Sequence, residues 1–118
     1  MKKSLMVLFV AVLAPISNST FAGDTPRSTA QKYITCLRME DFRAAYRERI
    51  DGGAGIPEKY KDMAPIIMSE ARIVRVENVN YSTAIVYISV KTPQGDRITL
   101  PMKLVRRNGE WKIANQKF

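Results

Sequence analysis

The pattern of apolar and polar positions divides the chain into a helical first part and a β-rich second part. After residue 25, apolar residues recur at steps of three and four, as expected for one face of a helix. The first such stripe consists of Ala30, Tyr33, Ile34 and Leu37. After residue 71, apolar and polar residues alternate instead, and β-branched residues become frequent, which is typical of strands.

Three helical segments are predicted before residue 72. The first begins at Pro26, because Thr25 provides a capping hydroxyl and proline is tolerated at the first helical position. The second begins after Asp41, and a glycine-rich run ends it. Its apolar residues are Phe42, Ala45, Tyr46 and Ile50, and the arginines expected to point outward are Arg43, Arg47 and Arg49. The third runs over residues 57–63, and Pro65 predicts a kink or a further turn through residue 71.

Four strands are predicted in the second part. Three alternating segments cover residues 72–79, 83–91 and 97–107, and turn residues separate them. Asn108-Gly109 then predicts a tight hairpin into a short last strand, because a type I′ turn needs positive φ at both central residues. Pro101 lacks the N–H group that a strand donates to its neighbour, so we expect a sheet edge or a bulge there.

Side-chain alternation assigns two faces to each strand. One face of the second strand carries Ala84, Val86, Ile88 and Val90. One face of the third carries Ile98, Leu100, Met102 and Leu104. In the first strand, unbroken alternation places Glu77 on the face of Ile73 and Val79. Trp111 offers the largest apolar area in the chain and is expected to anchor the last strand against Leu104 and the helices.

Helices followed by an antiparallel meander predict a single α+β domain, with two to three N-terminal helices packed on a curved four-stranded antiparallel sheet. Three stretches, "AQKYITCLRMEDFRAAY", "STAIVYISVK" and "MKLVRRNGEWKI", carry a resemblance to the nuclear transport factor 2-like superfamily, a cystatin-like α+β cone. Within it, the chain is similar to small exported bacterial domains described as lumazine-binding, whose function is unknown. The resemblance covers nearly all of residues 25–113. Its motifs are structural, so it implies a fold rather than an activity.

The first 22 residues have the make-up of a secretory signal peptide. Lys2 and Lys3 precede an apolar core over residues 5–13, and Ala22 suits the last position before cleavage. The apolar core is roughly half as long as a membrane-spanning helix requires. We therefore expect residues 1–22 to be removed, which leaves one domain, residues 23–118, in the periplasm or secreted. No stable membrane span is expected after processing.

The chain carries 19 basic and 11 acidic side chains, a net charge of +8. Without Lys2 and Lys3, 17 basic side chains remain, a surplus of six over the acidic ones. These basic residues are spread along the chain, and no recognition motif accompanies them, so no nucleic-acid partner is expected. Weak attraction to anionic lipid or cell-wall polymer is expected instead.

The titratable residues do not form a catalytic or metal-binding motif. The chain has no histidine, so its one cysteine, Cys36, has no base partner and is expected to be a buried, unreactive thiol. Glu110, beside the hairpin turn, is expected to be a solvated carboxylate. The enzymes that the chain resembles use an Asp or His pair, or a Tyr with a protonated acid, and no such residue can be carried over. No catalytic residue, metal site or cofactor is predicted.

Three functions remain open. The first is a non-catalytic module of the bacterial envelope that binds an unidentified protein or small-molecule ligand. The resemblance implies that such a module can pair as a homodimer through the sheet face that carries Ile85 and Tyr87. The alternative is an isomerase or dehydratase that uses a pocket carboxylate, and an accessory role in secretion or toxin inhibition is the third. The candidate pocket residues are Tyr33, Tyr46, Tyr60, Met63 and Trp111. The alternative interpretation is that these side chains fill the core.

Overall fold

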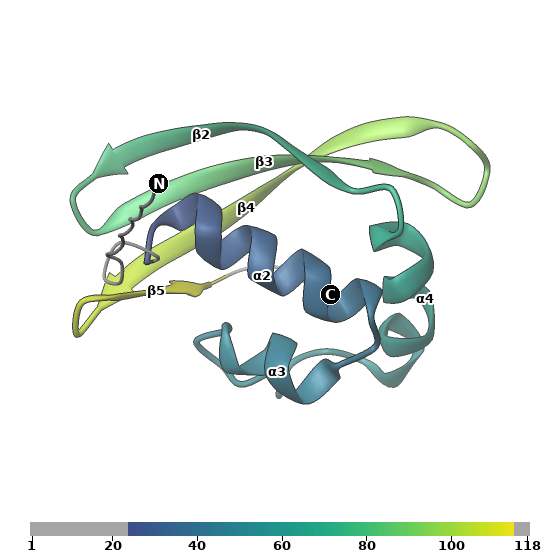
Figure 1. Cartoon of the computed structure of the whole chain (residues 1–118), viewed down its shortest axis with the longest axis horizontal. Coiled ribbons are helices and arrows are strands. Elements are labelled where there is room, and N and C mark those ends of the chain that lie inside the picture. Colours follow the sequence, from purple (N-terminus) through teal and green to yellow (C-terminus); the bar gives the residue numbers. More distant parts are fainter. Residues whose placement is uncertain (1–23, 115–118) are drawn as a thin grey trace, which may run out of the picture.

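The computed structural model describes residues 24–114, which form three helices followed by a four-stranded sheet. The helices are α2 (Pro26–Arg38), α3 (Phe42–Arg47) and α4 (Glu58–Met68), and the strands are β2 (Arg72–Asn80), β3 (Thr83–Lys91), β4 (Arg97–Arg107) and β5 (Glu110–Ile113). The strands lie side by side in sequence order, each antiparallel to the next. In Figure 1, α2 crosses one face of the curved sheet, with α3 and α4 beside it. The predicted α+β class is therefore confirmed.

The described residues correspond to the predicted domain of residues 23–118 except at its two ends. The predicted signal peptide, residues 1–22, lies outside the described residues. Between residues 24 and 114, none of the helices is long and apolar enough to cross a membrane.

Helix α2 begins as its sequence predicts. The Thr25 hydroxyl accepts a hydrogen bond from the Ser28 backbone N–H, the Ser28 hydroxyl accepts one from the Thr25 N–H, and Pro26 follows the cap. This reciprocal capping satisfies N–H groups that have no partner within the helix. The predicted stripe of Ala30, Tyr33, Ile34 and Leu37 is fully buried. Because α2 supplies the middle of the core, it fixes the position of the other two helices.

Helix α3 is shorter than predicted, because it ends at Arg47 instead of continuing to residue 50. The backbone of residues 48–50 pairs with strand β5: the Ile50 N–H donates to the Ile113 carbonyl at 2.9 Å, and the Ile113 N–H donates to the Glu48 carbonyl at 2.8 Å. This pairing satisfies backbone groups that a longer helix would have used. It also turns Arg49 into the interior and leaves Ile50 exposed, the reverse of the prediction for both residues.

Strand β2 contains a bulge that changes which side chains face the core. Ile73 lies opposite Ile88 and Arg75 lies opposite Tyr87, so Val74 is an extra residue. An extra residue shifts the alternation by one position, so the side chains from Arg75 to Asn78 change face, up to a second irregularity between Asn78 and Asn80. The prediction that Glu77 shares a face with Ile73 is therefore wrong. Glu77 lies on the face away from the helices.

The last hairpin agrees with its sequence. Asn108 and Gly109 both have positive φ, 54° and 78°, as a type I′ turn requires. Within residues 24–114, β4 pairs with β5 over residues 104–107, the Ala114 N–H donates to the Lys103 carbonyl, and no residue pairs with Pro101 on the β5 side. Figure 1 shows the β3–β4 hairpin extending past the helices, which explains why Ile98 on the inner face remains exposed.

Candidate functional site

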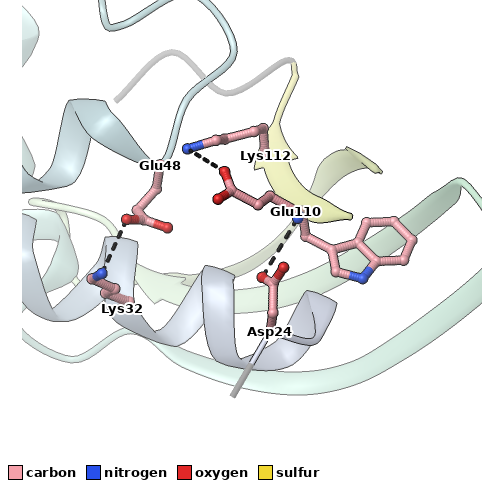
Figure 2. Close-up of a pocket in the computed structure, with 6 residues that line it drawn as sticks. Asp24, Lys32, Glu48, Glu110 and Lys112 are labelled. Atoms are coloured by element: carbon pink, nitrogen blue, oxygen red, sulfur yellow. Dashed lines mark hydrogen bonds and ion pairs between the residues drawn. The ribbon is translucent and has the colours of Figure 1, made fainter. Parts of the chain in front are cut away.

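The helices and the end of the sheet enclose a depression of about 300 Å³ on the surface of the protein. We call it the charged depression. Its residues come from the segment before α2, the middle of α2, the residue after α3 and strand β5 (Figure 2). The residues that line it are Asp24, Lys32, Glu48, Glu110, Trp111 and Lys112.

Backbone pairing brings these distant residues together. Because residues 48–50 pair with β5, Glu48 lies next to the strand that carries Glu110 and Lys112. The Lys112 ammonium donates to the Arg47 carbonyl at 2.7 Å, at the end of helix α3. A cation at this end of a helix is favoured, because the last carbonyls of a helix lack partners within it. Lys112 is thus held at the wall of the depression.

Two ion pairs occupy the charged depression. Lys32 lies 3.2 Å from Glu48, and Lys112 lies 3.6 Å from Glu110. Each pair has one inner and one outer member: Glu48 is 15% exposed and Lys112 is 29% exposed, whereas Lys32 and Glu110 are 62% and 66% exposed. The inner wall therefore presents one fixed carboxylate and one fixed ammonium, each covered by a partner that can move into solvent.

The predicted pocket residues are not brought together into one site. Tyr33 is fully buried in the core, and Tyr60 and Met63 lie on α4, with Met63 exposed. Tyr46 lines a second depression, on α3. Trp111 borders the charged depression through its backbone N–H, which donates to the Asp24 carboxylate at 3.5 Å.

The other lining residues were not predicted, except that Glu110 was expected to be solvated, which its exposure confirms. Asp24, Lys32, Glu48 and Lys112 look like ordinary charged surface residues of the segments that carry them. No signal in the sequence distinguishes them, because their proximity depends on the pairing of residues 48–50 with β5.

Tyr33 forms part of a buried polar cluster. Arg49 donates two hydrogen bonds of 2.8 Å to the Asp51 carboxylate and a longer one, of 3.4 Å, to the Tyr33 hydroxyl. Burial raises the pKa of Tyr33 to about 12, although Arg49 opposes this rise. The hydrogen bonds from Arg49 lower the pKa of Asp51 to about 2. At neutral pH the phenol is therefore protonated and the carboxylate ionised, so neither group is poised to exchange a proton.

The raised pKa of Tyr33 predicts a loss of stability in alkaline solution. The unfolded chain releases this proton near pH 10 and the folded protein near pH 12, so the free energy of unfolding falls as the pH rises between these values. By pH 11 the loss is roughly 1 kcal/mol. Urea unfolding at pH 9 and pH 11 should show a larger loss in the wild type than in Tyr33→Phe, in which Tyr46 and Cys36, whose pKa values are also raised, still contribute. Tyr81→Phe, at an exposed tyrosine, should behave as the wild type.

The face of the sheet away from the helices carries a second tyrosine–carboxylate pair. The Tyr87 hydroxyl donates to Glu77 at 3.0 Å, and the Arg75 guanidinium lies 3.9 Å from the centre of the Tyr87 ring. Ile85 and Tyr87, the predicted dimer residues, are half-buried on this face. The phenol–carboxylate contact is therefore on an open surface of the described domain.

The thiol of Cys36 is half-buried rather than fully buried and packs against the core. Burial, followed by the nearby charge of Asp41, raises its pKa, so the thiol stays protonated at neutral pH. Within residues 24–114, no three side chains of His, Cys, Asp or Glu are grouped so that they could hold a metal ion.

Comparisons with known proteins show the fold of the chain. No protein-family model matches the sequence, and no curated protein matches it. The crystal structure of a protein from Campylobacter jejuni named as an NTF2-like transpeptidase is similar, with 13% identity and a TM-score of 0.51 over 78% of this chain and 99% of that one. NTF2 denotes nuclear transport factor 2.

Two further solved structures align less closely. An NTF2-like protein of unknown function from Cytophaga hutchinsonii has 15% identity and a TM-score of 0.48 over 77% of this chain and 88% of that one. A SEC-C motif containing protein from Rhodopseudomonas palustris has 11% identity and a TM-score of 0.49 over 77% and 76%. At such identities the likeness to the Campylobacter protein concerns the fold alone. The chain therefore has the nuclear transport factor 2-like fold that its sequence resembles.

Proposed function

We propose that the chain is an exported, non-catalytic binding protein of the bacterial envelope, and that the charged depression is its ligand site. The signal-like residues 1–22 support export of the domain at residues 23–118. The observation that carries the binding function is the arrangement of the two ion pairs, in which an exposed partner covers each inner charge.

This arrangement favours a ligand that carries both an ammonium and a carboxylate. The ligand ammonium would replace Lys32 beside Glu48, and the ligand carboxylate would replace Glu110 beside Lys112. Exchange is inexpensive, because an exposed ion pair contributes only about 0–1 kcal/mol. An amino acid or a short peptide has this chemistry.

The acid and base groups support binding rather than catalysis. An isomerase or dehydratase of the predicted kind needs a carboxylate beside a phenol in an enclosed pocket. Glu77 and Tyr87 form such a contact on the open face of the sheet. Tyr33 in the core and Asp51, which is bonded to the buried Arg49, are held in unreactive protonation states.

Binding of glycylglycine, measured by NMR titration of the purified protein, tests this proposal. Glu48→Gln and Lys112→Met should each weaken binding by roughly tenfold, because each removes a charge-assisted hydrogen bond. N-acetylation of the dipeptide should weaken binding to the wild type and not further to Glu48→Gln. Amidation of its carboxyl group should weaken binding to the wild type and should not weaken binding to Lys112→Met any further.

Glu58→Gln provides the matched control, because Glu58 forms an exposed 3.2 Å ion pair with Lys61 on α4, outside the depression. This variant should bind glycylglycine as the wild type does. Equal weakening in Glu58→Gln, or shifted resonances only at residues far from α3 and β5, would rule out the charged depression as the site.

A further inference from the structure

Helix α3 borders a second depression, of about 350 Å³, which we call the arginine–tyrosine pocket. Its lining residues are Arg43, Tyr46, Arg47 and Gly52. Arg43 and Arg47 are four residues apart on α3, so they lie on the same side of the helix, and both are exposed. The half-buried ring of Tyr46 belongs to the same depression.

The two arginines of this pocket differ from the arginines that the described fold engages. Arg38 donates to the Met68 and Ala71 carbonyls, and Arg97 lies 3.4 Å from Glu70. Between residues 24 and 114, neither Arg43 nor Arg47 has a side-chain hydrogen bond or an ion pair. Two neighbouring guanidinium groups without a counter-charge raise the local positive potential and favour an anion between them.

The ring of Tyr46 is held in a fixed position. It packs against Gly53, where an added Cβ would lie 2.5 Å from its Cδ2 atom, and its centre lies 6.0 Å from that of the Phe42 ring. The Lys61 ammonium also lies 6.0 Å from the ring centre. A fixed aromatic surface beside free guanidinium groups needs little reordering when a flat ligand binds.

We propose that the arginine–tyrosine pocket binds a phosphomonoester carried on a ring, with the phosphate between Arg43 and Arg47 and the ring against Tyr46. A guanidinium binds two oxygens of a phosphate in parallel, and a phosphomonoester carries close to two negative charges at neutral pH. In charge and in number of oxygens, a phosphomonoester therefore matches two arginines better than a single carboxylate does. This site is separate from the charged depression and does not depend on the function proposed for it.

Phenyl phosphate is the probe for this proposal, with inorganic phosphate and phenol as its two halves. In NMR titrations of the purified protein, phenyl phosphate should bind more tightly than either half and should shift the resonances of α3. Arg43→Gln and Arg47→Gln should each weaken its binding by roughly tenfold. Tyr46→Leu should remove the preference for phenyl phosphate over phosphate and leave phosphate binding in place.

Arg72→Gln is the matched control, because it removes the same charge from an exposed arginine on β2, outside the pocket. It should weaken binding by less than twofold. Weakening equal to that of Arg43→Gln would overturn the proposal and show a general effect of net charge.

The phosphomonoester has two sources, a free small molecule or the headgroup of a lipid. Vesicles of phosphatidylcholine with and without phosphatidylinositol 4-phosphate, whose phosphomonoester is carried on the inositol ring, distinguish them. Binding to the phosphatidylinositol 4-phosphate vesicles that both α3 substitutions abolish would assign the phosphate to a lipid, and binding of phenyl phosphate alone would assign it to a free ligand. If neither probe binds, the proposal is wrong.

Discussion

Replacing Gly53 by alanine should destabilise the protein by roughly 2–5 kcal/mol, the sum of backbone strain and overpacking. Gly53 has a φ of 85°, in the left-handed region that favours glycine. An added Cβ would also lie 2.5 Å and 2.9 Å from two carbons of the Tyr46 ring, so the ring would have to move. Urea unfolding followed by circular dichroism measures the loss.

Gly52→Ala separates the two contributions. Gly52 has a φ of 63°, but nothing lies within 4 Å of the position of its Cβ. Its substitution should therefore lower the free energy of unfolding only by the backbone strain, about 1–2 kcal/mol. If both variants lose the same stability, the Tyr46 ring does not pack against Gly53 as described. A shifted ring in Gly53→Ala should also disturb the arginine–tyrosine pocket.

Truncation of Trp111 to alanine should lower the free energy of unfolding by about 3–5 kcal/mol. Trp111 is only 7% exposed and joins the core from β5, the shortest strand. Without this anchor, Ile113 is the remaining buried apolar residue of β5, so the pairing of β5 with residues 48–50 should weaken as well. Urea unfolding followed by circular dichroism reports the stability of this variant.

Tyr81→Ala is the control for Trp111→Ala. The Arg106 guanidinium lies 5.8 Å from the centre of the Tyr81 ring and 5.9 Å from that of the Trp111 ring. Unlike Trp111, however, Tyr81 is 83% exposed. Its truncation should therefore change stability by no more than about 0.5 kcal/mol. Hydrogen exchange at the Ile50 and Ile113 amides should accelerate in Trp111→Ala and remain unchanged in Tyr81→Ala. Unchanged exchange in both variants would contradict the anchoring role of Trp111.

The elements of the fold could be predicted because the signals for them are local. The Thr25 cap, the stripe of α2, the alternation of β3 and the Asn108-Gly109 turn each depend on neighbouring residues, and the structure confirms all four. The order of helices and strands then allows few arrangements, because the apolar face of the helices and the apolar face of the sheet must pack against one another. The α+β class therefore followed from the sequence.

The candidate sites were decided by contacts between residues far apart in the chain. The sequence favours a longer α3 with an exposed Arg49, but strand β5 captures the backbone of residues 48–50 and turns that arginine inward. Likewise, alternation predicts the wrong face for Glu77, because the bulge at Val74 appears only in the pairing of β2 with β3.

The sequence by itself determined which segments are helices or strands and which apolar side chains form the core, because periodicity and capping act over a few residues. Only the tertiary structure decided which charges meet. Lys32, Glu48 and Lys112 are ordinary surface residues of their own segments, and they form one depression because long-range backbone pairing places those segments together. Hydrogen bonds between distant backbone groups leave no local signature in side-chain pattern, and so the sequence did not reveal the site.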